Sequence, residues 1–193
     1  MGKREDARER LLEAAVQEFA ANGYAAANLE AIANASGVTR GPLYYYFGNK
    51  AGLYRETIAY EIEKHRLRYA EILREDAPVR DVIREDLLYC LADHTLFSRI
   101  GESDEEPDCS DLLREFRVWL IQRKHDVFSA ARTRGELSRD CDVGSLITFI
   151  YVWYNGVTGA RRTMEGLPKA YYDQRMLEDG VSEFMEILEQ RFL

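Results

Sequence analysis

The sequence predicts an all-α protein in which a small N-terminal helix-turn-helix domain precedes a larger helical domain. Apolar residues recur three and four positions apart along most of the 193 residues, which is the spacing of one face of a helix. No stretch shows sustained alternation of apolar and polar residues between hairpin turns. Short stretches with Gly, Pro or Asn separate the periodic segments and divide them into consecutive helices.

The first predicted helix runs from about Arg4 to Asn22. Its apolar residues form a single stripe that marks the side packing inward: Leu11, Leu12, Ala15, Val16 and Phe19. The pair Asn22-Gly23 ends the helix, because Gly readily takes the left-handed conformation that closes a helix C-terminus.

The next segment, residues 28–54, reads NLEAIANASGVTRGPLYYYFGNKAGLY and carries the most informative pattern of the chain. Asn28 is a good N-cap for a first short helix, because its side chain can accept a hydrogen bond from a free N–H group. Gly37 follows that helix where the chain must turn sharply, which Gly does at the least steric cost. The apolar face of the helix comprises Leu29, Ile32, Ala33 and Ala35.

A second short helix follows the turn. Thr39 can cap it, and Pro42 falls in its first turn, where a missing N–H group costs little. Leu43 and Phe47 lie one helical turn apart and can pack inward. The opposite side carries Arg40, Gly41, Pro42, Tyr45 and Tyr46. Two short helices joined by a Gly-containing turn make a helix-turn-helix, whose second helix enters the major groove of DNA.

Over residues 1–60 this pattern resembles the TetR family of transcriptional regulators. The residues that stand in register with the family's pattern are Phe19, Gly23, Tyr24, Ile32, Ala33, Ala35, Gly37, Val38, Thr39, Gly41, Leu43, Tyr44, Phe47, Lys50 and Leu53. Two positions depart from it, since Ala27 stands where Thr is usual and Tyr46 where His is common. The resemblance implies a ligand-responsive DNA-binding regulator, most often a repressor, that acts as a homodimer on a palindromic operator.

The resemblance also implies which side chains meet double-stranded DNA. Arg40, Gly41, Pro42 and Tyr45 approach base edges, while Thr39, Tyr44, Tyr46 and Lys50 hold phosphates, and Asn28 is a further candidate. Arg40 suits its role because a guanidinium can form a bidentate pair with guanine. Lys50 adds positive charge beside a helix N-terminus. Partial burial is the alternative reading of the three Tyr residues, and Glu30 is either a cytosine contact or a solvated side chain.

Five longer helices follow the helix-turn-helix. Asn49 caps the first of them, and Pro78 stands after its end. The acidic segment Gly101 to Asp108 is the clearest loop. We expect a DNA-binding domain over residues 1–52 and a regulatory and dimerisation domain over residues 53–193. The predicted helices are Lys50 to about Arg74, Val79 to about Arg99, Asp111 to about Thr133, Val143 to about Met164 and Tyr171 to about Arg191.

The helix predicted from Val143 to Met164 is apolar on nearly all sides, so we expect it to be buried on more than one face. Its small residues let another helix approach closely, although Gly within a helix costs about 1 kcal/mol against Ala. In the family the last two helices form a four-helix dimer interface. The resemblance places that interface at Val152, Asn155, Gly156, Gly159, Phe184, Ile187 and Leu188. The alternative is a core helix within one chain.

Members of the family often hold a small molecule among the middle helices. The candidate residues for an unknown effector are Tyr89, His94, Phe116, Arg117, Trp119, Trp153 and Tyr154. Arg117 is the most informative of these, because an Arg on a largely apolar helix favours an anionic partner. Plain core packing of the aromatic residues and a surface position for Arg117 are the alternatives.

The formal net charge of −8 is unevenly distributed. Residues 1–60 hold seven basic and seven acidic side chains, so the whole acidic excess lies in the remainder of the chain. An acidic remainder repels DNA and leaves the N-terminal segment as the tolerable contact face.

Cysteine usage and motifs argue against other classes of protein. Cys90, Cys109 and Cys141 are widely spaced and lack CxxC spacing, which predicts neither a disulfide framework nor a metal site. No catalytic motif or cofactor loop appears, so we expect no enzyme activity and no cofactor. The longest apolar run, residues 146–154, is too short to span a bilayer and no signal peptide is evident, so we expect a cytoplasmic protein without membrane contact. An oxidant-sensing regulator acting through Cys, and a helical ligand-binding protein without DNA binding, remain as alternatives.

Overall fold

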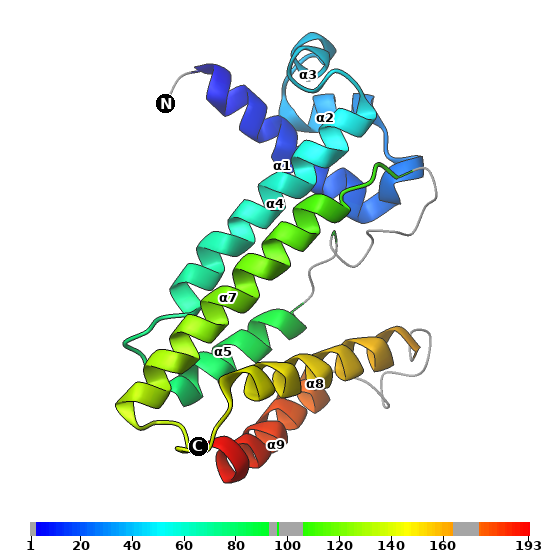
Figure 1. Ribbon diagram of the computed structural model, residues 1–193. Helices are drawn as coiled ribbons and strands as arrows, with labels where there is room; N and C mark the ends of the chain where they lie inside the picture. Colours follow the sequence, from blue (N-terminus) through cyan, green and yellow to red (C-terminus); the bar gives the residue numbers. More distant parts are fainter. Residues whose placement is uncertain (1–2, 93–95, 97–105, 164–173) are drawn as a thin grey trace. The chain divides into compact units, whose positions relative to one another are not determined.

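The computed structural model describes residues 3–92, 96, 106–163 and 174–193, and every regular element in those ranges is an α-helix (Figure 1). This confirms the predicted all-α fold. The helices are α1 Lys3–Ala26, α2 Leu29–Ser36, α3 Arg40–Phe47, α4 Lys50–Ile72, α5 Val79–Leu91, α7 Ser110–Arg134, α8 Val143–Thr163 and α9 Gln174–Phe192.

The chain divides into two compact units. The first unit comprises Met1–Arg66 and Asp93–Phe116, and the second comprises Leu67–Ala92 and Arg117–Leu193. Both α4 and α7 therefore contribute residues to each unit. The domain boundary expected after residue 52 stays a prediction.

The first unit holds the helix-turn-helix on a continuous apolar core. Its central side chains are Leu11, Leu12, Ala15, Phe19, Ile32, Leu43, Leu53 and Ile58. Tyr54 of α4 stands edge-on to Phe19 and Tyr24 of α1, with ring centroids 4.9 and 5.1 Å apart. Cys109, just before α7, is buried with this core. The packing fixes α2 and α3 against α1 and the first turns of α4.

Helix α1 is longer than the sequence indicates. Gly23 interrupts it with φ 70° and ψ 173°, a left-handed conformation, but helical structure resumes and reaches Ala26. The N–H group of Ala27 donates to the carbonyl oxygen of Gly23 at 3.2 Å. The predicted end of the first helical segment at Asn22-Gly23 is therefore confirmed, and the sequence analysis missed only the further helical turn to Ala26.

The second unit packs α5 against α8 and α9. In Figure 1, α8 and α9 lie side by side at the C-terminal end of the chain. Trp153 of α8 stacks on Phe184 of α9 with the ring centroids 4.3 Å apart. The buried apolar side chains of the unit include Val82, Ile83, Leu87, Val127, Phe128, Leu146, Ile150, Val181, Phe184 and Leu188.

The connection between α4 and α5 is held by two side chains that follow each other closely in the sequence. The guanidinium of Arg134 donates to the carbonyl oxygen of Ala77 at 3.1 Å and to the carboxylate of Glu136 at 2.5 Å. The second oxygen of Glu136 accepts from the N–H group of Val79, the first residue of α5, at 2.7 Å. A helix N-terminus leaves such donors without an intrahelical partner, so Glu136 replaces a local cap.

Helix α5 is shorter than predicted. It ends at Leu91, because Ala92 is extended with φ −60° and ψ 153°, whereas the sequence pattern indicated a helix to about Arg99. Residues 93–95 and 97–105, including most of the predicted acidic loop, lie outside the described residues.

Candidate functional site

The turn of the helix-turn-helix forms as its residue types predict. The side chain of Asn28 accepts a hydrogen bond from the N–H group of Glu30 at 2.8 Å and so caps α2. Gly37 is left-handed with φ 67° and closes the same helix. The N–H group of Asn28 also donates to the carboxylate of Glu18 on α1 at 2.9 Å, which ties the start of α2 to α1.

Helix α3 buries one side and exposes the other. Leu43 and Phe47 are 0% and 7% exposed, whereas Tyr45 is 78% exposed. Thr39 occupies the N-cap position but makes no capping hydrogen bond through its side chain. Its hydroxyl therefore stays open to other partners, as a phosphate contact requires.

The three consecutive Tyr residues differ in exposure. Tyr44 is 48% exposed, while Tyr46 is half-buried and packs against the apolar core of the first unit. The rings of Tyr45 and Tyr46 meet edge-on at 5.3 Å. Partial burial, the alternative reading from the sequence, therefore applies to Tyr46 more than to Tyr44. Gly41 and Tyr45 are exposed, and Pro42 is half-buried on the same outer side.

Arg40, the first residue of α3, pairs with Glu30 on α2. Its Nη2 atom lies 2.5 Å from Glu30 Oε2, and the two side chains are 56% and 60% exposed. Glu30 is therefore a solvent-exposed side chain that also pairs with the guanidinium expected to read a base, and whether it contacts cytosine stays a prediction.

Lys50, the first residue of α4, is directed by two contacts from the end of α1. Its ammonium donates to the carbonyl oxygen of Ala25 at 2.9 Å and lies 5.0 Å from the centroid of the Tyr24 ring. Asn49 caps α4 by accepting from the N–H group of Gly52 at 2.8 Å, as the sequence predicts. The ammonium keeps further N–H groups beside this helix N-terminus, where an anion is favoured.

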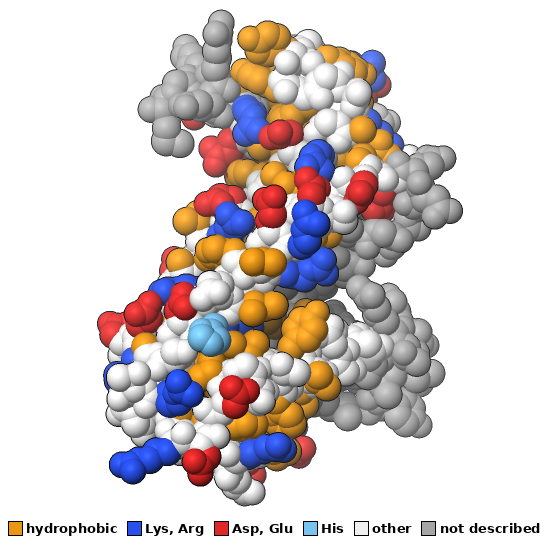
Figure 2. Space-filling view, viewed as in Figure 1, with side chains coloured by type: hydrophobic (Ala, Val, Ile, Leu, Met, Phe, Trp, Pro, Cys, Tyr) orange, Lys and Arg blue, Asp and Glu red, His pale blue; other side chains and the backbone are white. Residues whose placement is uncertain are grey.

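Figure 2 shows hydrophobic side chains at the surface around α3, rather than a continuous field of positive charge. Arg8 adds a further cation nearby, but it pairs with Glu56 at 2.5 Å. Arg40 and Arg8 are thus each paired with a carboxylate, and we expect DNA binding at this face to depend on a few placed groups and on aromatic hydroxyls.

The residues predicted to hold an effector are not all brought together. Phe116 belongs to the first unit, where its ring lies 6.4 Å from that of His65. Arg117 is exposed on α7, in the second unit, so the surface reading applies to it. Trp119 is half-buried on the same helix, and His94 lies outside the described residues. Tyr89, Trp153 and Tyr154 remain as half-buried candidates within the second unit.

A buried polar cluster in the second unit was missed by the sequence analysis. Asp86 is 0% exposed, and its carboxylate accepts a hydrogen bond from the ammonium of Lys124 at 2.7 Å. Cys90 and Tyr69 adjoin the pair. Asp86 stands beside Leu87 on the apolar face of α5, and a charged residue within such a stripe is the signal that could have found it.

The predicted dimer residues separate into two groups. Val152 and Ile187 are 63% and 52% exposed, and Asn155 is exposed. Among the described residues, a Cβ atom added at Gly156 would meet no atom within 4 Å, so the described part of the chain leaves this face of α8 uncovered there. Phe184 and Leu188 are instead buried in the core of their own unit, at 2% and 0% exposure.

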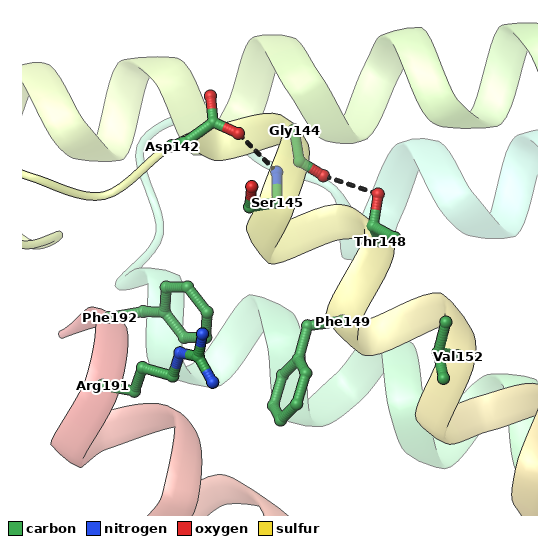
Figure 3. Close-up of a pocket in the computed structure, with 8 residues that line it drawn as sticks. All are labelled: Asp142, Gly144, Ser145, Thr148, Phe149, Val152, Arg191 and Phe192. Atoms are coloured by element: carbon green, nitrogen blue, oxygen red, sulfur yellow. Dashed lines mark hydrogen bonds between the residues drawn. The ribbon is translucent and has the colours of Figure 1, made fainter.

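A groove between α8 and α9 continues this open face (Figure 3). Its volume is about 540 Å³ and its lining includes Phe149 and Val152 of α8 and Arg191 of α9. The guanidinium of Arg191 lies 5.6 Å from the centroid of the Phe149 ring. Figure 2 shows hydrophobic side chains gathered where α8 and α9 lie. An apolar surface of this kind is typical of a contact with another protein chain.

The cysteines are poorly suited to redox chemistry. Burial, with a further contribution from Asp86, raises the pKa of Cys90 to about 12, and burial also raises the pKa of Cys109 and of Cys141. A thiol that stays protonated at neutral pH is a weak nucleophile.

Among the described residues no group of three or more His, Cys, Asp or Glu side chains could hold a metal ion, and no helix has the length and apolar character to cross a membrane.

Residues 11–57 match the family model described as bacterial regulatory proteins, tetR family. The HTH-type transcriptional regulator SrpR of Pseudomonas putida is 25% identical over 202 residues, which cover 98% of this chain and 89% of that protein. The "Probable acrEF/envCD operon repressor" of Escherichia coli (strain K12) is 43% identical over 49 residues, 25% of this chain and 22% of that protein.

Solved structures share the fold at lower identity. Escherichia coli NemR in its reduced form superposes with a TM-score of 0.73 at 18% identity, covering 94% of this chain and 97% of that one. FadR from Bacillus subtilis, in complex with stearoyl-CoA, superposes with a TM-score of 0.65 at 20% identity, covering 92% and 96%. The helix-turn-helix geometry, the family match over residues 11–57 and the relatives together indicate a TetR-family transcriptional regulator, and the solved structures share its fold.

Proposed function

We propose that this protein represses transcription by binding a palindromic operator as a homodimer and releases that operator when a small molecule occupies the second unit. The observation that carries the DNA-binding part is the outer side of α3. There Arg40 and Tyr45 are exposed while Leu43 and Phe47 anchor the helix in the core. A recognition helix needs this division between an anchored side and a free side.

The flanking groups support the same assignment. Thr39 has an uncommitted hydroxyl at the start of α3, and Lys50 stands at the start of α4. Both lie at helix N-termini, which favour phosphate oxygens. We assign Asn28, Tyr44 and Tyr46 to the backbone-contacting group as well, and Gly41 and Pro42 to the surface that enters the groove.

Selection from a randomised duplex library tests the proposal, with the salt dependence of binding recorded for the selected sites. We expect a palindrome with half-sites about one helical turn apart and a steep loss of affinity with salt. A library that shows no enrichment at low salt would contradict operator binding and leave a helical ligand-binding protein as the function.

Dimerisation through α8 and α9 is supported by the exposed apolar side chains there. Val152→Glu would place a charge in the proposed interface, and Val118→Glu is a matched control, because both valines are 63% exposed on long helices. We expect sedimentation to show a monomer for the first variant and a dimer for the second. Equal behaviour of the two variants would contradict an interface at Val152.

The effector response is supported by the way one helix joins the two units. Helix α4 begins in the first unit at Lys50 and ends in the second at Ile72. An effector that binds one arrangement of α4 more tightly shifts the population towards it, and only such differential affinity can drive release. Operator release by a bound small molecule, measured by fluorescence anisotropy, tests this part.

A further inference from the structure

The second unit contains a charged pair in a place where apolar packing is the rule. Asp86 is completely buried on α5, beside the core residues Ile83 and Leu87. Lys124 of α7 reaches it, with Nζ 2.7 Å from Asp86 Oδ2. The Lys124 side chain is 12% exposed, so Lys124 is the less buried partner of the pair.

Two further polar side chains extend the pair. The Cys90 sulfur lies 3.7 Å from Asp86 Oδ1, and the Tyr69 hydroxyl lies 3.0 Å from that sulfur. The Lys124 ammonium is 5.9 Å from the centroid of the Tyr69 ring. Tyr89 stands edge-on to Tyr69 at 5.1 Å and provides an aromatic wall. Carboxylate, ammonium, thiol and phenol are thus gathered in one place between α4, α5 and α7.

Stability alone does not account for this cluster. The desolvation of two charges generally offsets their attraction, so apolar residues of similar volume serve a core at least as well. Burial lowers the pKa of Lys124, but Asp86 and the neighbouring groups raise this pKa by more than burial lowers it. The net shift of the Lys124 pKa is therefore upward. Lys124 therefore stays charged at neutral pH, and its charge is cancelled by Asp86.

The cluster retains unused hydrogen-bond donors. A Lys ammonium has three N–H groups, and among the described residues Lys124 uses one of them, on Asp86. Tyr154 of α8 is half-buried, and its hydroxyl makes no hydrogen bond within the described part of the chain. Burial raises the pKa of Tyr154, Cys90 raises it further and Lys124 lowers it. The phenol of Tyr154 therefore interacts electrostatically with Cys90 and Lys124.

We propose that Lys124 and Tyr154 form the polar end of an effector site that takes an uncharged, largely apolar compound carrying one acceptor oxygen, such as a ketone, ester or ether. Each of the two groups supplies a donor for the acceptor oxygen, and Tyr69 and Tyr89 are the aromatic side chains beside Lys124. Because Asp86 already neutralises Lys124, a ligand carboxylate would bury an additional negative charge, which a low-dielectric site disfavours. The assignment of this ligand as the effector rests on the proposed function.

Three probes with the same ring separate the ligand classes. Benzylacetone is an uncharged ketone, hydrocinnamate replaces its acetyl group with a carboxylate, and butylbenzene has no acceptor. Isothermal titration of the full-length protein at neutral pH gives the three affinities. We expect benzylacetone to bind at least about tenfold more tightly than either of the others. Tighter binding of hydrocinnamate, or no binding of benzylacetone, would overturn the proposal.

Variants assign the effect to named groups. Tyr154→Phe removes a hydroxyl that has no partner in the described residues. We expect this variant to lower the affinity for benzylacetone about three- to tenfold and to leave the affinity for butylbenzene unchanged. Tyr60→Phe is the matched control, because Tyr60 lies in the first unit and is also half-buried. The double variant Asp86→Leu/Lys124→Met removes both charges without leaving either unpaired. It should abolish the preference for the ketone, and a preference that survives would overturn the proposal.

An operator-release assay separates the site from the proposed function. Ketone binding that depends on Lys124 and Tyr154, without operator release, supports the site and contradicts the effector response. Operator release by benzylacetone that persists in the double variant supports the effector response and overturns the site.

Discussion

The guanidinium of Arg40 is held 2.5 Å from the carboxylate of Glu30, so the first residue of α3 is directed by the first turn of α2. Both side chains are more than half exposed, and a pair of this kind contributes little to stability. We expect the pair to have its effect in the proposed DNA complex. Glu30 fixes the direction of the Arg40 guanidinium and partly neutralises the charge of Arg40. We expect this to weaken the attraction of Arg40 to phosphate groups more than it weakens a bidentate hydrogen bond from Arg40 to guanine.

Glu30→Gln should therefore make DNA binding stronger and less selective. The change removes a negative charge beside the phosphates and frees Arg40 for contacts that carry no sequence information. We expect affinity for a scrambled duplex to rise several-fold and the ratio between operator and scrambled duplex to fall. Fluorescence anisotropy over a series of salt concentrations measures both. Glu63→Gln, an exposed position on α4, is the control. Indistinguishable behaviour of the two variants would show that the pair has no part in selectivity.

Arg40→Ala and Lys50→Ala should weaken operator binding in different ways. Loss of the Arg40 guanidinium should cost about 1–3 kcal/mol and relax base preference at one position of each half-site. Loss of the Lys50 ammonium should weaken binding to all sequences alike and reduce the salt slope by about one. Competition with single-base operator variants distinguishes the two patterns. An unchanged base preference in the Arg40→Ala variant would show that Arg40 does not recognise a base.

Local rules account for what the sequence predicted well. Asn28 and Asn49 cap helices because their side chains reach N–H groups two or three residues away. Gly37 takes a positive φ at the turn, and the spacing of Leu43 and Phe47 places both in the core. Each of these outcomes depends on a few consecutive residues, which is why one sequence suffices to predict it.

Contacts between distant residues account for what was missed. Asp86 and Lys124 meet across two helices, and no local pattern indicates which cation would reach a carboxylate in the apolar stripe of α5. The Arg40–Glu30 pair depends in the same way on how α2 and α3 cross. Phe184 shows a different ambiguity, because a side chain that stacks on Trp153 within the chain has the same sequence spacing as one that contacts a second chain.

Glu136→Gln should destabilise the second unit in a pH-dependent way. Arg134, and then the N–H group of Val79, lower the pKa of Glu136 below its usual value of 4.5. A lowered pKa means that the ionised group stabilises the fold above about pH 4.5 and that this contribution disappears as the pH falls through the folded-state value. The carboxylate is near the surface, so we expect less than about 1 kcal/mol at neutral pH.

Chemical denaturation of both proteins from pH 7 to pH 3 measures this difference. The free energies of unfolding should differ most at neutral pH and converge at low pH. Glu115→Gln, on the exposed side of α7, is the control and should show no such convergence. A difference that stays constant with pH would mean that the hydrogen-bond geometry matters and the charge does not.

Operator binding should resist mild oxidation. Burial and Asp86 keep the Cys90 thiol protonated, with a pKa of about 12, and a thiolate is needed for rapid reaction with peroxide. Cys109 and Cys141 are buried as well. We expect slow alkylation of the native protein by iodoacetamide, rapid alkylation after denaturation, and unchanged operator affinity after peroxide treatment. The variant with all three Cys replaced by Ser is the reference. Peroxide-driven release that this variant lacks would instead establish an oxidant sensor, because only a Cys could then carry the response.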